Sequence, residues 1–185
     1  MTLRKVPINP GVSVLGVLKH LNYKEWFAIA EFVDNSVQSF RANRNALATA
    51  GSKYLRVQIL ISEDGIIRIE DNAAGIPLSE FPRAFRPAHA PEDASGLSEF
   101  GMGMKSAACW FAPRWSIRTK ALGEAVERTV EFDISSIVDQ SIEELDAEER
   151  PASEEAHYTV VELRDVARLP RTKTLGKIRE HLSDI

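Results

Sequence analysis

Four polar residues recur at helical spacing in the first third of the chain. Glu31, Asp34, Asn35 and Gln38 stand at offsets of three, four and seven, so a helix would place them on one face. Taken alone, the pattern fits a solvated helix face. It also fits a catalytic one, in which Asn35, a neutral oxygen donor, helps to hold a magnesium ion. Glu31, one turn earlier, would then orient and deprotonate an attacking water.

A second candidate is the carboxylate of Asp71, at the end of an alternating apolar run. Ile67, Ile69 and Asp71 share one face of the predicted strand, so the carboxylate should be half buried. An ionised group that leaves water without a partner costs several kcal/mol, so Asp71 needs a dedicated donor, and the exocyclic amine of adenine is one candidate. Gly75 would let the backbone approach the base closely. The alternative is an Asp-Asn turn that closes the strand.

The third candidate is a glycine-rich loop over residues 96–106 that opens a helix. Gly101 and Gly103 would expose backbone N–H groups at a positive helix end, which suits phosphate oxygens, and Lys105 would add a cation. Neither the phosphate loop of P-loop NTPases nor the dinucleotide fingerprint fits this spacing. A plain helix entry is the competing interpretation.

The elements that must position these residues follow from the hydropathy pattern. Helices are expected over residues 23–44, 78–85 and 101–111, and strands over residues 54–62, 66–71, 115–119, 128–134 and 158–163. The acidic stretch over residues 139–155, within an insertion spanning 135–157, predicts a solvated helix and loop. This order predicts an α+β fold, a two-layer sandwich in which helices cover one face of a mostly antiparallel mixed sheet.

The composition indicates one mildly acidic globular domain. The 185 residues are 44% hydrophobic and 27% charged, with a net charge of -4, so no global nucleic-acid footprint exists. The single cysteine, Cys109, and the absence of an apolar signal core favour a cytoplasmic location, with no membrane partner. A helical pattern begins at residue 174 and stops at residue 185. It predicts a domain over residues 1–173 followed by the start of a helix that leads to a further domain, or else a frayed terminus.

Together, and in this order, the segments resemble the GHKL ATPase family, which includes gyrase, heat-shock chaperones, histidine kinases and MutL, and whose fold is called the Bergerat fold. Residues 31–36 resemble the family's E-x-x-D-N segment, residues 71–76 its D-x-G-x-G segment, and residues 100–103 its second glycine box. Thr159 resembles the late-strand threonine that helps to read adenine. Within the family, MORC-like and chaperone-like ATPase domains are the most similar, and Lys105-Ser106 supports the MORC-like choice.

The resemblance implies a role for each matching residue. It implies ATP and Mg²⁺ as ligands, Glu31 as general base, Lys105 as a second catalytic residue at the phosphates, and Asn35 as magnesium ligand. It implies nucleotide contacts by Asn35, Asp71, Gly75, Ile76, Gly101, Met102, Gly103, Met104, Lys105 and Thr159, and an ATP lid over residues 77–99. Three positions depart from the family pattern, namely Ala73, Ser98 and Gln38. If the backbone at Ala73 needs a positive φ, the loop would be strained.

The activity implied is magnesium-dependent ATP hydrolysis by the N-terminal domain of a larger protein. Lid closure would be coupled to homodimerisation, the isolated chain would turn over slowly or not at all, and DNA or a protein client would bind through further domains. Two alternatives stay open: a histidine kinase catalytic domain, and a nucleotide-gated interaction module without turnover. Glu31→Ala separates the hydrolase from the module, because only the hydrolase has turnover to lose.

Overall fold

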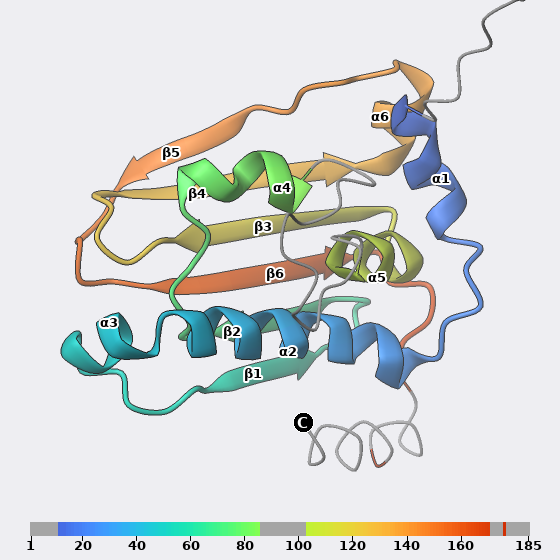
Figure 1. Cartoon of the computed structure of the whole chain (residues 1–185). Helices are drawn as coiled ribbons and strands as arrows, with labels where there is room; N and C mark the ends of the chain where they lie inside the picture. The colour runs from blue at the N-terminus through green and yellow to red at the C-terminus, as the bar shows by residue number, and fades with distance from the viewer. Residues whose placement is uncertain (1–10, 86–102, 171–175, 177–185) are drawn as a thin grey trace, which may run out of the picture.

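A single sheet organises the chain in the computed structural model, which describes residues 11–85, 103–170 and Gly176. Its six strands lie in the order β1-β2-β6-β3-β4-β5, and every neighbouring pair is antiparallel (Figure 1). The strands are β1 (Val57–Ile61), β2 (Ile67–Asp71), β3 (Arg114–Lys120), β4 (Val126–Asp133), β5 (Ala147–Pro151) and β6 (Tyr158–Arg164). The last of the described strands, β6, therefore lies at the centre of the sheet.

The helices lie on one side of the sheet, with α2 in front of β1 and β2 and α5 in front of β6 (Figure 1). They are η1 (Gly11–Ser13), α1 (Val14–Leu18), α2 (Glu25–Ala42), α3 (Arg44–Thr49), η2 (Leu78–Glu80), α4 (Phe81–Phe85), α5 (Gly103–Phe111) and α6 (Ile134–Asp139). The two-layer α+β architecture predicted from the sequence is thus confirmed.

The core fills the space between the helices and the sheet. In β2, Ile67 and Ile69 are buried and alternate with half-buried residues, as period-two patterning requires. In α5, Ala107 and Ala108 are fully buried, and such small side chains let a helix approach its neighbours closely. Trp115 of β3 stacks on Phe132 of β4 with ring centroids 3.7 Å apart, and both rings are part of the core.

One sequence prediction is wrong over part of its length. Within the acidic stretch expected to form a helix and loop, Ala147–Pro151 forms the edge strand β5, which pairs with β4. All five residues are exposed, so no apolar alternation marks the strand. The pairing is instead supported across the strands by the ion pair between Arg128 and Glu149, at 2.7 Å.

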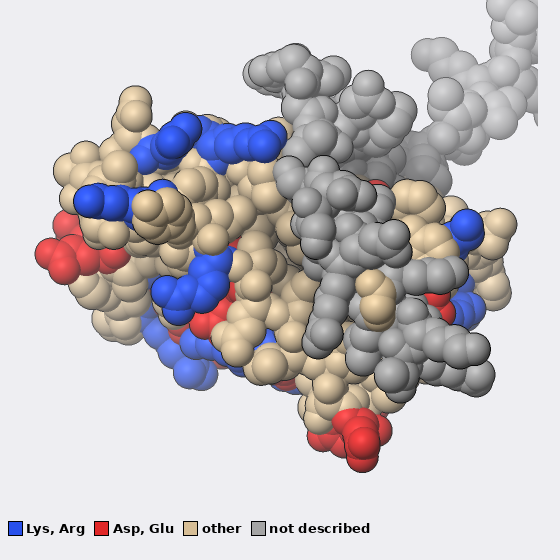
Figure 2. All heavy atoms as spheres, turned by 90° about the horizontal axis from the view of Figure 1, so that it is seen from below, with Lys and Arg blue, Asp and Glu red and all other residues tan. Residues whose placement is uncertain are grey.

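The surface seen from below carries both signs of charge. Lys and Arg side chains gather toward the end of the molecule where α3 lies, with Asp and Glu side chains among the neighbouring residues (Figure 2). None of the helices among the described residues is long and apolar enough to cross a membrane.

Candidate functional site

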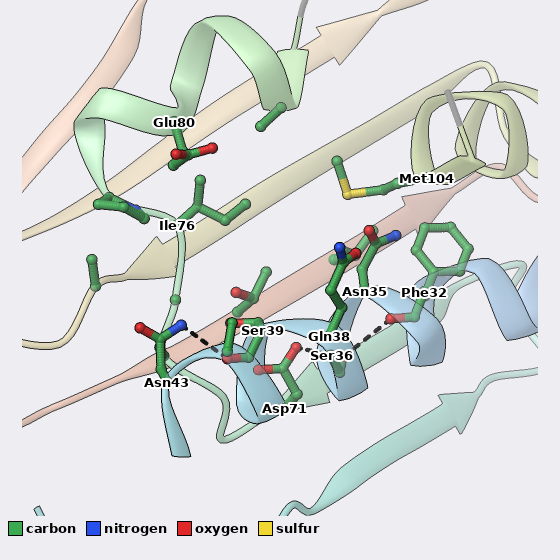
Figure 3. A pocket seen from close by; sticks show the side chains of 18 of the residues that line it. Phe32, Asn35, Ser36, Gln38, Ser39, Asn43, Asp71, Ile76, Glu80 and Met104 are labelled. Carbon is green, nitrogen blue, oxygen red and sulfur yellow. Dashed lines mark hydrogen bonds between the residues drawn. The ribbon is translucent and has the colours of Figure 1, made fainter. Parts of the chain in front are cut away.

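A cavity of about 570 Å³ lies between α2, the segment that follows β2, the start of α5 and the sheet (Figure 3). This volume is within the range of about 300–1,000 Å³ that is usual for small-molecule sites. In Figure 3, Asn35, Ser36 and Ser39 of α2 lie on one side, and Ile76, Glu80 and Met104 lie opposite. Further residues of the wall include Gln38, Asp71, Gly75, Gly103, Lys105, Ala121, Leu122, Thr159 and Val161.

Asp71 is the buried anion of the cavity wall. Only 9% of its surface is exposed, because β2 ends with this side chain directed toward the helix layer. The Ser36 hydroxyl donates to Oδ2 at 2.7 Å, and the Ala73 N–H donates to Oδ1 at 2.9 Å. Burial raises the pKa of the Asp71 carboxyl, against the lowering effects of its hydrogen bonds from Ser36, Ala73 and the Thr159 backbone. A carboxylate with so little solvent is suited to accept from a ligand donor.

Residues of three neighbouring strands lie side by side next to Asp71. Asp71 of β2 lies opposite Thr159 of β6, which in turn lies opposite Thr119 of β3. The Thr119 hydroxyl oxygen lies 3.3 Å from that of Thr159, and it accepts from the Ile76 N–H at 2.8 Å. The segment after β2 is therefore tied back onto β3, which places Ile76 beside the cavity.

Gly75 is required because its backbone lies close to the backbone of Lys120. Gly75 has φ +72°, and a Cβ there would lie 2.1 Å from the backbone oxygen of Lys120. The sequence suggested that this glycine admits an adenine base, and the structure shows a second reason, because the β2 loop crosses the end of β3. The residue that replaces the family's first glycine is not strained: positive φ among the described non-glycine residues occurs at Ser141 and Asp165, and not at Ala73.

Asn35 reaches the cavity from α2, one residue before Ser36. Its amide Nδ2 donates to the Glu31 carbonyl oxygen at 2.5 Å, which fixes the side chain along the helix. Asn35 and Gln38 both line the cavity. A neutral amide oxygen at this position fits a magnesium ion that is held mainly by phosphate oxygens and water.

Glu31 lies at the edge of the site, against the first residue of α5. A Cβ built on Gly103 would be 1.9 Å from Oε2 of Glu31, so the carboxylate occupies the space that only a glycine leaves open. Burial, and then the nearby charge of Asp34, raises the pKa of the Glu31 carboxyl. Glu31 is not among the residues that form the cavity wall, whereas Gly103 is.

Lys105 is buried, with 2% of its surface exposed, although it borders the cavity. Its ammonium donates to the backbone oxygens of Arg83 at 3.3 Å and Ala84 at 3.0 Å, at the end of α4. Burial, and then the charge of Arg83, lowers the pKa of Lys105 to about 8. The sequence assigned this lysine to phosphate, and the structure places it on main-chain carbonyls.

The start of α5 meets the cavity through Gly103, Met104 and Lys105. The first N–H groups of a helix have no partner within the helix, so this end suits phosphate oxygens. Gly101, Met102 and Ser98 lie outside the described residues. Of the lid expected over residues 77–99, the described part forms η2 and α4, and Pro77, Glu80, Arg83 and Ala84 line the cavity. Of residues 174–185, only Gly176 is described, and it is helical.

Sequence reasoning missed two residues that organise the site, Ser36 and Thr119. Ser36 follows Asn35 and is buried against Asp71, but nothing in a helical pattern separates it from an ordinary small core residue. Thr119 sits in an expected strand, and its contact with the β2 loop depends on which strands are neighbours. Gln38, a departure from the family pattern, lies on the cavity wall and takes no part in holding Asp71.

The comparison with protein families agrees with this geometry. The family described as histidine kinase-, DNA gyrase B- and HSP90-like ATPase matches residues 23–159, a range that begins just before α2 and ends in β6. The matched range includes the three motif segments and Thr159. A search of individual curated proteins found no match. By its fold, its motif residues and this match, the chain belongs to the family of histidine kinase-, DNA gyrase B- and HSP90-like ATPases.

Proposed function

We propose that this domain binds ATP with Mg²⁺ in the cavity beside α2 and hydrolyses it, with Asp71 reading adenine, Asn35 holding the metal and Glu31 activating water. The observation that carries the proposal is the buried Asp71 carboxylate on the cavity wall, held in place by protein donors. The acceptor positions that remain on such an anion at a cavity favour a ligand that brings a donor.

Adenine fits the Asp71 end of the cavity. An ionised carboxylate has about four acceptor positions, and Ser36 and Ala73 supply donors to its two oxygens, so acceptor capacity remains for an exocyclic amine. Guanine would present a carbonyl oxygen in place of that amine and would be repelled. The apolar side chains of Ile76, Leu122 and Val161, which also line the cavity, suit the faces of a purine ring.

Phosphates fit the end of the cavity where α5 begins. The N–H groups of the first helical turn, which have no partner within the helix, and the positive end of the helix dipole favour bound anions. Mg²⁺, when bound, would offset the negative charge that develops on the phosphate oxygens during hydrolysis. Asn35 is the residue of α2 that would hold it, through the amide oxygen, while Nδ2 stays on the Glu31 carbonyl.

Glu31 is the proposed general base. A base works best when its pKa lies near the working pH, and burial moves the pKa of Glu31 upward, in that direction. The carboxylate lies against Gly103, at the start of α5, and so beside the phosphate end. From this position it would accept a proton from a water molecule that attacks the terminal phosphate.

The wider context is also a proposal. The Lys105-Ser106 pair supports a MORC-like or chaperone-like ATPase domain spanning residues 1–173, with residues 77–99 as the ATP lid. In such proteins lid closure is coupled to dimerisation, so we expect slow turnover by the isolated chain. A histidine kinase relative would transfer phosphate to protein, and radiolabelled ATP would detect this.

Calorimetric binding of a non-hydrolysable ATP analogue with Mg²⁺ tests the site, with Asp71→Asn as the variant. In this variant the amide oxygen would still accept from the Ala73 N–H. The amide nitrogen would donate to the Ser36 hydroxyl, which would in turn donate to the Phe32 carbonyl oxygen, 3.1 Å away. The variant should fold normally, yet it presents a donor to the adenine amine. We expect binding near micromolar, about -8 kcal/mol, in the native chain, and a loss of at least about 100-fold in the variant.

Glu31→Ala is the matched control for chemistry. It should retain analogue binding within about threefold and abolish phosphate release, because the base acts in the transition state and not in binding. Equal binding by the native chain and a folded Asp71→Asn variant would contradict the adenine assignment. Turnover that survives Glu31→Ala would contradict the general base.

A further inference from the structure

Lys105 stands between two elements that enclose the nucleotide cavity. It is the third residue of α5, and its ammonium reaches the backbone oxygens of Arg83 and Ala84 in α4. These carbonyls belong to the last turn of α4, where main-chain oxygens have no partner within the helix and favour a cation. At its own end of α5, the same cation faces the unfavourable end of the helix dipole. The charge of Lys105 is therefore favourable for α4 and unfavourable for α5.

The surroundings of the ammonium support the same assignment. Burial to 2% exposure would be strongly unfavourable unless hydrogen bonds compensate the charge. Among the described residues, no ion pair is found for Lys105, and Arg83 is the charged group that acts on it, by repulsion. The two carbonyls are therefore its structural partners, and the contact is specific to main-chain oxygen.

The element that Lys105 holds forms one wall of the cavity. Pro77 and Glu80 precede α4, Arg83 and Ala84 belong to it, and all four line the cavity. Figure 3 shows Glu80 opposite the polar residues of α2. A change in the position of α4 would therefore change the width of the cavity. It would weaken the binding of the nucleoside as well as of the phosphates.

We propose that Lys105 is a positioning residue, a strut that holds α4 against α5 and so sets the wall of the nucleotide cavity, and that it is not a phosphate ligand. The inference rests on the proposed nucleotide site for its functional consequence. The strut itself is a property of the protein without ligand.

The first test is amide hydrogen exchange of residues 81–85 in the nucleotide-free chain, comparing the native chain with Lys105→Met. Methionine keeps the length and burial of the side chain and removes the donors. We expect exchange in α4 to accelerate by at least about tenfold, since a charge-assisted contact is lost, while the melting temperature stays the same or rises because no cation is buried. Arg83→Gln is the matched control, since it removes a side chain from α4 and leaves the carbonyl that Lys105 binds. Exchange there should remain within about twofold.

The second test compares adenosine, ADP and a non-hydrolysable ATP analogue as ligands. A strut predicts that Lys105→Met weakens all three by a similar factor, about three- to tenfold. A phosphate ligand predicts no change for adenosine and a loss that grows with each phosphate.

Unchanged exchange of residues 81–85, or a loss confined to the phosphorylated ligands, would overturn the strut. If the native chain binds none of the three ligands, the proposed function fails, whereas the exchange measurement still decides whether Lys105 holds α4.

Discussion

At the scale of single residues, the surroundings of Glu31 predict how turnover depends on pH. Burial and the charge of Asp34 raise the pKa of Glu31. A base must be deprotonated to act, so turnover should fall as pH decreases through this raised pKa. Asp34→Asn removes one of the two causes and should move the acidic limb of the kcat profile to lower pH.

The acidic limb is measured as phosphate release, with Gln38→Glu as a control that changes charge on the same helix but lies on the cavity wall. Superimposable limbs for the native protein and Asp34→Asn would mean that Glu31 is not the titrating base.

A second prediction at this scale concerns the space between Glu31 and Gly103. In the native chain, Gly103→Ala places a methyl group 1.9 Å from the Glu31 carboxylate, so the carboxylate must move. We expect a loss of about 100-fold in turnover with analogue affinity within about threefold, because a misplaced base costs rate and not binding.

The stability of the same variants provides an independent check. Gly103→Ala should stabilise the native chain less than it stabilises a Glu31→Ala background, because the flexible Glu31 side chain must move away from the new methyl group. In the Glu31→Ala background, alanine at a helical position should stabilise by about 0.5 kcal/mol. Thermal unfolding of the four proteins measures this difference. Equal changes in both backgrounds would show that the Glu31 carboxylate does not lie against Gly103.

At the scale of elements, the crossing of the β2 loop over β3 makes Gly75 far more sensitive than other turn glycines. Gly75 and Gly123 both have positive φ, at +72° and +81°, but no atom lies within 4 Å of a Cβ added at Gly123. Gly123→Ala should therefore cost about 1 kcal/mol from backbone strain alone. Gly75→Ala adds a collision with Lys120 and should cost about 3 kcal/mol or more.

Urea unfolding of the two alanine variants measures the difference. Equal costs would mean that the loop can lift away from β3, in which case the tie between Thr119 and Ile76 would not fix it.

The same scale separates what could be predicted from what could not. The long helix, the hairpin and the late strands follow from local periodicity, and Asp71 follows because alternation continues through Ile67 and Ile69. The strand β5 carries no such signal, because its five residues are exposed and only the neighbouring β4 gives them a strand partner. The sequence predicts helices and strands where one face of the element is buried, and it does not predict a strand that is determined only by its pairing with a neighbour.

The candidate site divides in the same way. The residues proposed to touch a ligand, Asp71 and Asn35, stand in motifs whose chemistry shows in the sequence. The residues that hold them in place do not, because Ser36 and Thr119 act across elements that are distant in the chain. Lys105 shows a third case. Its motif indicated a phosphate contact, and its burial against α4 depends on bonds to residues 22 and 21 positions earlier, which no local pattern encodes.

At the scale of the whole molecule, a ligand that bridges α2, the sheet and α5 should stabilise all of them together. At 100 times its dissociation constant, ADP with Mg²⁺ should add about 2.7 kcal/mol to the free energy of unfolding, a rise of about 5–10 °C in melting temperature for a domain of this size. Calorimetric melting at several nucleotide concentrations measures it.

Asp71→Asn, which should keep the fold, is the control for that melting experiment and should show no nucleotide-dependent rise. A rise of equal size in both proteins would point to nucleotide binding somewhere other than the cavity beside α2.

The central place of β6 has a consequence for how the domain is made. Thr159, on the last of the described strands, lies between Asp71 of β2 and Thr119 of β3. Until that strand inserts, the two halves of the sheet have no shared edge, and a slip of one residue would turn Thr159 to the opposite face. A chain emerging from the ribosome can therefore complete this part of the cavity wall only when residue 159 has been made and lies in register.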